Sequence, residues 1–153
     1  MRDIELEFKL QKSLNEGKNV WVIGDVHGFN MTLRCLVEKI NPQQGDYVVL
    51  LGDLIDRGPN SYDVVQFAKT SDNIVCVKGN HEHKIIRYID GANVILGPPN
   101  IVTTEQFERE GGQIFKQDFE DIVRQYCEDF IQLSDSLFVT HAGMEPDFWR
   151  AID

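Results

Sequence analysis

Four short turns in this sequence contain residues that could bind metal cations. They are residues 24–28 (GDVHG), 52–58 (GDLIDRG), 79–82 (GNHE) and 141–143 (HAG). Their carboxylate, amide and imidazole groups, with no thiolate among them, suit Mn, Fe or Zn in a mixed oxygen–nitrogen site better than a structural zinc–cysteine site. An aspartate in such a site can bridge two cations about 3.5–4 Å apart, which holds the attacking and leaving oxygens of a phosphoryl group. The four turns together predict a two-metal centre for phosphate chemistry.

Each turn taken alone has a simpler interpretation. An aspartate beside a glycine is most often a turn residue, and a single histidine at a strand end is most often a packing residue. Four such turns in one chain favour a functional interpretation, because each also carries glycine, which lets the backbone approach a ligand closely.

A short apolar run precedes each of the four turns. These runs are residues 20–23 (VWVI), 47–51 (YVVLL), 74–77 (IVCV) and 137–140 (LFVT). Continuous apolar runs are typical of strands that are buried on both faces in a mainly parallel or mixed sheet. Ligands collect beyond the carboxyl ends of strands in an open α/β sheet, so we expect the four turns to meet there.

Helical patterns alternate with these strands. The predicted helices cover residues 31–40, residues 62–69 with Ser61 as the N-cap, a segment that begins near His81, and residues 115–133. Residues 90–104 predict a loop that could reach over the site. The alternation of strand and helix predicts a layered α/β fold.

Length and charge limit the possible partners and surroundings. The 153 residues suffice for a single domain, and the net charge of −10 argues against a nucleic-acid backbone or an anionic membrane as partner. Cys35, Cys76 and Cys127 follow no CxxC pattern and are predicted to be buried, reduced thiols. No apolar run approaches the roughly 20 residues of a membrane span, which predicts a soluble, cytoplasmic protein.

Several polar and aromatic residues outside this ligand set also carry expectations. His83 is predicted to lie on the exposed side of its helix, and Glu82 to support the site residues from behind. Trp21 and Trp149 are predicted to be packing residues, and the acidic stretch at residues 105–110 to be the solvated face of a helix.

The motifs GDVHG, GDLIDRG, GNHE and THAG, in this order, resemble those of the calcineurin-like metallophosphoesterases. The DRG and GNHE forms look like the phosphoprotein phosphatase branch, which includes serine/threonine phosphatases and symmetrical diadenosine tetraphosphatases. The resemblance runs from about Val20 to Pro146. It implies a layered α/β fold with mixed β-sheets flanked by helices.

The resemblance also implies a set of metal ligands. Asp25 and His27 would hold the first ion, Asp53 would bridge both ions, and Asn80 and His141 would hold the second. Two divalent cations are implied, with Mn favoured over Fe, Zn or Ni. A hydroxide held between them would attack phosphorus.

Three catalytic roles follow from the same resemblance. His81 would donate a proton to the leaving group and would be oriented by Asp56. Arg57 would clamp the phosphoryl oxygens, and Asn80 would contact the substrate beside it.

The chain differs from the family pattern near its C-terminus. Family members continue past the HAG motif and supply a later histidine to the second metal site, whereas all four histidines here are already assigned. We expect a single domain over residues 1–153 that corresponds to the N-terminal two-thirds of the family domain. It would be a fragment, a natural short form, or a chain completed by another chain whose swapped strands supply the missing half of the sheet. Open sheet edges would also favour a homo-oligomer or poor solubility.

The expected activity is metal-dependent hydrolysis of a phosphate ester on a serine/threonine phosphoprotein or a small phosphorylated metabolite. A dinucleoside polyphosphate hydrolase is the alternative, because residues 141–146 (HAGMEP) are similar to the HAGI-x-P form of those enzymes. A truncated, weakly active module that only binds metal or phosphate is a third possibility. The presence of both His81 and Arg57 argues against it, since a pure binder needs no proton donor.

Overall fold

The computed structural model describes residues 2–111, 119, 123–124 and 126–143. The helices are α1 (Ile4–Asn15), α2 (Asn30–Ile40), α3 (Ser61–Thr70), α4 (Asn80–Ile89) and α5 (Pro98–Gly111). The strands are β1 (Val20–Ile23), β2 (Tyr47–Leu50), β3 (Ile74–Val77), β4 (Cys127–Glu128), β5 (Ile131–Ser134) and β6 (Leu137–Val139). This order confirms the predicted α/β fold and, within a residue, the four predicted strands.

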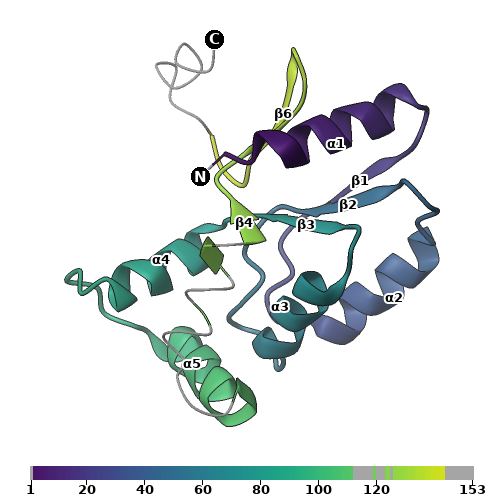
Figure 1. Cartoon of the computed structure of the whole chain (residues 1–153). Coiled ribbons are helices and arrows are strands. Elements are labelled where there is room, and N and C mark those ends of the chain that lie inside the picture. Colours follow the sequence, from purple (N-terminus) through teal and green to yellow (C-terminus); the bar gives the residue numbers. More distant parts are fainter. Residues whose placement is uncertain (1, 112–118, 120–122, 125, 144–153) are drawn as a thin grey trace.

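The main sheet consists of four parallel strands in the order β1-β2-β3-β4. Strands β5 and β6 pair antiparallel in a separate two-stranded sheet. Figure 1 shows α1 and this hairpin on one side of the main sheet, and α2, α3, α4 and α5 on the other. Because β1, β2 and β3 are parallel neighbours, their carboxyl ends lie side by side.

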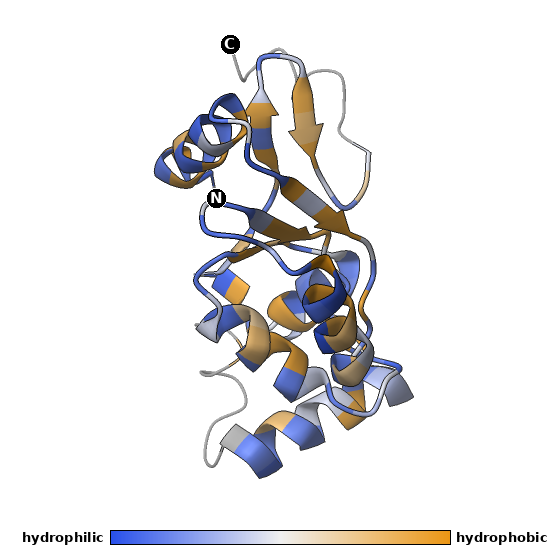
Figure 2. Cartoon of the chain, turned by 90° about the vertical axis from the view of Figure 1, so that its right-hand side faces the viewer, coloured by the Kyte–Doolittle hydropathy of each residue, from blue (hydrophilic) through white to orange (hydrophobic). Residues whose placement is uncertain are grey.

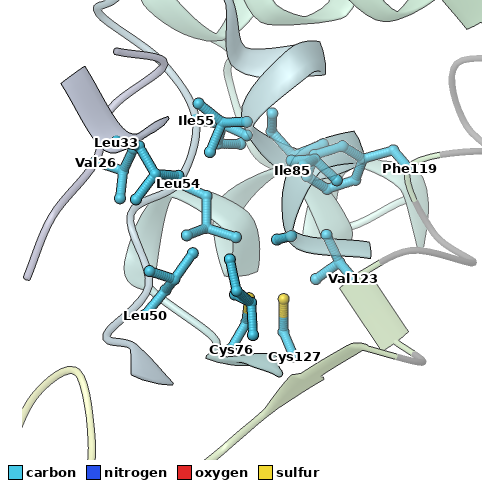
Figure 3. Packing of buried hydrophobic residues seen from close by; sticks show 14 of the residues in the cluster. Val26, Leu33, Leu50, Leu54, Ile55, Cys76, Ile85, Phe119, Val123 and Cys127 are labelled. Atoms are coloured by element: carbon cyan, nitrogen blue, oxygen red, sulfur yellow. The ribbon is translucent and has the colours of Figure 1, made fainter. Parts of the chain in front are cut away.

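The two faces of the main sheet bury two separate clusters, since alternate residues of a strand point to opposite faces. Leu50 and Cys76 pack with the apolar sides of α2, α3, α4 and α5 (Figure 3). Val48 belongs to the same cluster. Val49 and Val77 instead pack with α1 and the hairpin. In Figure 2 the strands are largely hydrophobic, while the helices carry hydrophilic residues on one side and hydrophobic residues on the other.

Strand β1 departs from the prediction that every strand is buried on both faces. Strands β2 and β3 are almost entirely buried, but Trp21 and Val22 of β1 are 41% and 48% exposed. Among the described strands β1 pairs only with β2, so one of its edges is open. The prediction that Trp21 is a packing residue is therefore wrong in this structure, and Trp149 lies outside the described residues.

The predicted helix at residues 115–133 is wrong in its second half. Residues 119, 123, 124 and 126 are helical, but the segment then forms β4 and β5. Residues 131–134 alternate between buried and more exposed side chains, which is the pattern of a strand, and the same apolar spacing also fits a helix in part. Pairing with β3 decides the outcome, because Cys127 lies opposite Cys76 in the sheet. The rest of the segment lies outside the described residues.

Three helices also differ from expectation. The predicted loop at residues 90–104 is helical from Pro98, because prolines are tolerated in the first turn of a helix. Ser61 is not the N-cap of α3 but its first residue, and its hydroxyl instead accepts a hydrogen bond from the amide of Asp56. Helix α1 was not predicted, since its charged residues mask the leucines that pack against the sheet.

The remaining expectations concern the burial of the cysteines, the exposure of the acidic stretch and the possibility of a membrane span. Cys76 and Cys127 are buried as predicted, whereas Cys35 is exposed; all three are free thiols. The acidic stretch of α5 is exposed at Glu105 and Glu108, but Phe107 between them is buried in the core. Among the described residues, no helix combines the length and apolar character needed to cross a membrane.

Candidate metal centre

Three of the four turns meet at the carboxyl edge of the main sheet, as predicted. Residues 24–28 follow β1, residues 52–58 follow β2 and residues 79–82 follow β3. The fourth ligand segment arrives from the other sheet, because His141 follows β6. The first two turns are joined by backbone hydrogen bonds, including those from the amides of Val26 and His27 to the carbonyl of Asp53.

The backbone of these turns is held in an unusual conformation. His27, Asp53, Asp56 and Arg57 all have positive φ angles, of 47°, 48°, 69° and 66°. Residues other than glycine rarely adopt this region, and they remain there only where the surrounding structure over-determines them. Among the described non-glycine residues, only Asn41 at the end of α2 shares the feature. The strain is therefore concentrated at the predicted site.

Close packing of the turns after β2 and β3 explains why residue 79 is a glycine. A side chain at Gly79 would collide with the backbone amide and carboxylate of Asp53. Only glycine lets the turn after β3 lie directly against the turn after β2. This contact brings Asn80 and His81 next to Asp53, and the His81 amide donates to Asp53 Oδ1 over 3.1 Å.

Asp53 lies at the centre of the cluster and is shared by two groups of possible ligands. One group is His27, Asp53 and His81, and the other is Asp25, Asp53 and His141; in each, the ligand atoms lie within 4.8 Å of one another. Asp53 Oδ2 is 3.7 Å from His27 Nε2, while Asp53 Oδ1 is 3.5 Å from His141 Nε2. The two oxygens of one carboxylate thus face two different imidazoles, which suits a bridging ligand.

The hydrogen bonds of His27 fit a metal ligand. Its Nδ1 lies 3.0 Å from the carbonyl of Ile55, which can only accept, so Nδ1 is the donor of this hydrogen bond. Nε2 is buried without a hydrogen-bond partner among the described residues, and it faces Asp25 Oδ2 at 3.6 Å and Asp53 Oδ2 at 3.7 Å. A buried ring nitrogen without a hydrogen-bond partner, facing two carboxylates, is a position that a bound cation would satisfy.

His141 also has a backbone carbonyl at Nδ1, but its Nε2 has an oxygen partner within hydrogen-bond distance. Its Nδ1 lies 2.5 Å from the carbonyl of Leu51, and its Nε2 lies 2.9 Å from Asn80 Oδ1. A backbone carbonyl that accepts from one ring nitrogen and leaves the other for a cation is the usual support of a metal-binding histidine. The donor set of carboxylate, amide and imidazole groups therefore fits divalent cations.

A histidine–carboxylate pair lies beside this cluster. His81 Nδ1 is 2.6 Å from Asp56 Oδ2, and the Asp56 side chain is completely buried. The other nitrogen, His81 Nε2, is 3.3 Å from Arg57 Nη2 and 3.8 Å from Asp53 Oδ2. His81 is therefore oriented by Asp56 and faces both an exposed guanidinium group and the shared carboxylate.

The profile of the calcineurin-like phosphoesterase family matches residues 18–153. The chain belongs to this family. It is 46% identical over 67 residues to serine/threonine-protein phosphatase 1 of Salmonella typhimurium, covering 42% of this chain and 30% of that protein. It is 27% identical over 145 residues to the asymmetrical bis(5'-nucleosyl)-tetraphosphatase PrpE of Bacillus subtilis, covering 82% of this chain and 58% of the relative.

Solved structures agree with this assignment. A putative diadenosine tetraphosphatase is 26% identical, with a TM-score of 0.60 over 83% of this chain and 51% of its own. A protein serine/threonine phosphatase from Saccharomyces cerevisiae shares the fold at 18% identity, also with a TM-score of 0.60. The chain thus spans between about a third and three-fifths of the length of these proteins.

Glu82 joins the turns that follow β2 and β3 through hydrogen bonds to backbone amides. Its carboxylate is fully buried and accepts from the backbone amides of Gly79 at 2.8 Å, Asp53 at 2.9 Å and Leu54 at 2.9 Å. Burial raises the pKa of the Glu82 carboxyl, while these amides oppose the shift. The predicted supporting role of Glu82 is confirmed, and His83 is exposed as expected.

Sequence analysis missed the residues that surround Asp56. Asn100 and Thr103 of α5 donate hydrogen bonds to its carboxylate, and Gln106 accepts from the Ser61 amide at 2.6 Å. These residues lie at three-residue spacing on one side of a helix. That spacing was the available signal, but it carries meaning only once the segment is known to be helical.

Proposed function

We propose that this chain carries the phosphate-ester hydrolysis centre of its family. The observation that supports the proposal best is the carboxylate of Asp53, whose two oxygens face the Nε2 atoms of two imidazoles and which lies beside the His81–Asp56 pair. A metal site with a purely structural role would need only the metal ligands. The adjacent histidine–carboxylate pair and Arg57 add the groups that phosphoryl transfer requires.

The metal ligands are proposed as the resemblance implies. Asp25 and His27 would hold one ion, Asp53 would be shared by both, and Asn80 and His141 would hold the other. Mn²⁺ would be preferred because oxygen ligands dominate. Two bound divalent ions supply a nucleophilic oxygen at neutral pH and neutralise developing charge on the phosphoryl group. Two carboxylates, one amide and two imidazoles would hold these ions at the carboxyl edge of the main sheet.

Arg57 and His81 are proposed to handle the phosphoryl and leaving groups. The Arg57 guanidinium is a rigid fork of donors that matches phosphoryl oxygens, and the Asn80 amide contacts the substrate beside it. His81 delivers a proton from Nε2 to the leaving oxygen, while its Nδ1 proton stays bonded to Asp56. Because Nε2 is only 3.3 Å from Arg57 Nη2, both groups can act on one phosphate.

The proposed substrates are phosphoserine or phosphothreonine proteins and small phosphomonoesters. The match to the Salmonella protein phosphatase, at 46% identity over 67 residues, supports this class. A dinucleoside polyphosphate is the second candidate, since the match to the Bacillus tetraphosphatase extends over 82% of the chain. Direct comparison of a phosphopeptide with diadenosine tetraphosphate as substrates distinguishes the two.

The test combines bound metal with turnover. We expect at least one Mn²⁺ per chain and Mn-dependent hydrolysis of p-nitrophenyl phosphate. His81→Asn is expected to lower kcat by about 10²–10⁴-fold on an alkyl phosphate. Arg87→Ala is the control, since Arg87 is an exposed residue of the same helix. Less than one ion per chain with no turnover would contradict the proposed function.

We also propose that the open edge of β1 pairs with a second copy of the chain. Trp21 and Val22 are exposed, and β1 has a strand partner on only one side among the described residues; both observations support this, because open edges favour strand addition. Trp21→Lys should shift the protein toward monomer in sedimentation velocity. A wild-type chain that stays monomeric at high protein concentration would overturn the proposal.

A further inference from the structure

Helix α5 buries three polar side chains on the side that faces the site. Asn100, Thr103 and Gln106 are 3%, 0% and 5% exposed and follow one another at three-residue intervals. Burying a polar group is costly unless it is hydrogen-bonded, so the partners of these residues explain their presence. Two of the three contact the same carboxylate, that of Asp56.

The Asp56 carboxylate is held on every side. Thr103 Oγ1 donates to Oδ1 at 2.6 Å, and Oδ2 receives both the Asn100 amide and His81 Nδ1. The Asp56 amide in turn donates to Ser61 Oγ at 3.0 Å and to Thr103 Oγ1 at 3.2 Å. With all of these groups in place, the carboxylate cannot rotate without breaking several hydrogen bonds at once.

Asn100 is itself fixed, which determines the group it presents. Its Oδ1 accepts from Lys84 Nζ at 2.8 Å and from the Gly97 amide at 3.0 Å. The amide nitrogen must therefore point toward Asp56 and act as a donor there. Lys84 lies on α4, the helix that also carries His81, so Asn100 ties α4 to the start of α5.

We propose that Asn100 and Thr103 are positioning residues that act through Asp56 on the orientation of His81. They hold Oδ2 in line with His81 Nδ1, which in turn directs Nε2 toward Arg57 and Asp53. This inference rests on the proposed role of His81 as proton donor. It adds to the site a helix that lies outside all four ligand turns.

The test compares two leaving groups, since a misplaced proton donor matters most for a poor one. Thr103→Val removes only the hydroxyl at nearly constant shape. It should lower kcat on an alkyl phosphate about tenfold more than kcat on p-nitrophenyl phosphate, without change in KM. Thr103→Ser should restore the ratio. Asn100→Leu should act in the same direction as Thr103→Val.

Two controls separate positioning from general damage. Thr104→Val changes the next residue of α5, whose hydroxyl bonds to the Ile101 carbonyl of the same helix, and should leave the ratio unchanged. In a His81→Asn background Thr103→Val should have no further effect on alkyl phosphate, because both changes remove the same contribution. Equal losses on both substrates, or additive effects with His81→Asn, would overturn the proposal.

A spectroscopic measurement on the metal-free protein tests the geometry independently of turnover. The Nδ1 proton of His81, assigned by its absence in His81→Asn, should be protected from exchange in wild type and in Thr103→Ser. It should exchange faster in Thr103→Val. An unchanged exchange rate would overturn the proposal, whereas loss of turnover with the expected exchange pattern would contradict the proposed function alone.

Discussion

The chain contains two Gly-Asp turns with very different surroundings. Gly52-Asp53 follows the central strand β2, and the Asp53 side chain is 5% exposed; Gly24-Asp25 follows the edge strand β1, and the Asp25 side chain is 55% exposed. The Asp53 amide is held by the buried carboxylate of Glu82. The same dipeptide therefore places a buried, fixed carboxylate in one turn and a solvent-facing carboxylate in the other.

The neighbouring strands cause this difference. Strand β2 lies between β1 and β3, so its turn packs against the turns on both sides, with Gly79 directly against Asp53. Strand β1 has a described neighbour on one side only. We conclude that position in the sheet, more than local sequence, decides how firmly a metal ligand is held.

The most direct way to test the comparison is to remove one ligand from each turn. Asp53→Asn should weaken Mn²⁺ binding by more than about 100-fold and reduce occupancy of both positions, since the carboxylate is shared. Asp25→Asn should cost about tenfold or less and affect one ion, because water can replace an exposed oxygen ligand. Isothermal titration with Mn²⁺ measures both; equal losses would contradict the distinction.

Removing the buried Glu82 carboxylate, which binds the turn after β2, should give the largest loss of stability. Glu82→Ala leaves the buried amides of Gly79, Asp53 and Leu54 without their acceptor and should cost about 3–5 kcal/mol in the free energy of unfolding. Chemical denaturation measures the change. Glu108→Ala on the exposed side of α5 is the control and should stay within about 0.5 kcal/mol. Similar effects of the two changes would contradict the role of Glu82.

The two strands offer a matched pair of valines. Val22 of β1 and Val49 of β2 lie opposite each other in register, but Val49 is 0% and Val22 48% exposed. Val49→Ala should cost about 2 kcal/mol, because it removes buried methyl groups and leaves a cavity. Val22→Ala should cost less than about 0.5 kcal/mol in the same denaturation experiment. A comparable loss at Val22 would mean that this side of β1 is covered in solution.

The smallest effect concerns thiol reactivity. Hydrogen bonding with Cys76, together with burial, raises the pKa of the Cys127 thiol well above its usual range, so less of the reactive thiolate is present at a given pH. Cys35, in contrast, is exposed to solvent. A disulfide reagent at pH 8 should modify one thiol per native chain and three after unfolding. Cys35→Ser should abolish the native reaction, and rapid modification of a second thiol would contradict the buried Cys76–Cys127 pair.

Local sequence was sufficient to predict strands β1–β3 and the ligand turns that follow them. An apolar run such as residues 74–77 is readily identified as a strand when a glycine turn and a helical pattern follow it. Aspartate and histidine residues in such turns can be identified as possible metal ligands from the sequence alone. The supporting function of Glu82 could be predicted from its place in the GNHE motif. These features depend on residues that are near one another in the chain.

Tertiary structure decided the remaining features, because burial and pairing join distant residues. Residues 127–128 and 131–134 became strands through pairing with β3 and β6, although their apolar spacing also fitted a helix. Exposure of Trp21 depends on which strand lies beside β1, not on its own sequence. The support of Asp56 by Asn100 and Thr103 joins residues 44 and 47 positions apart, and only packing of α5 against the site could reveal it.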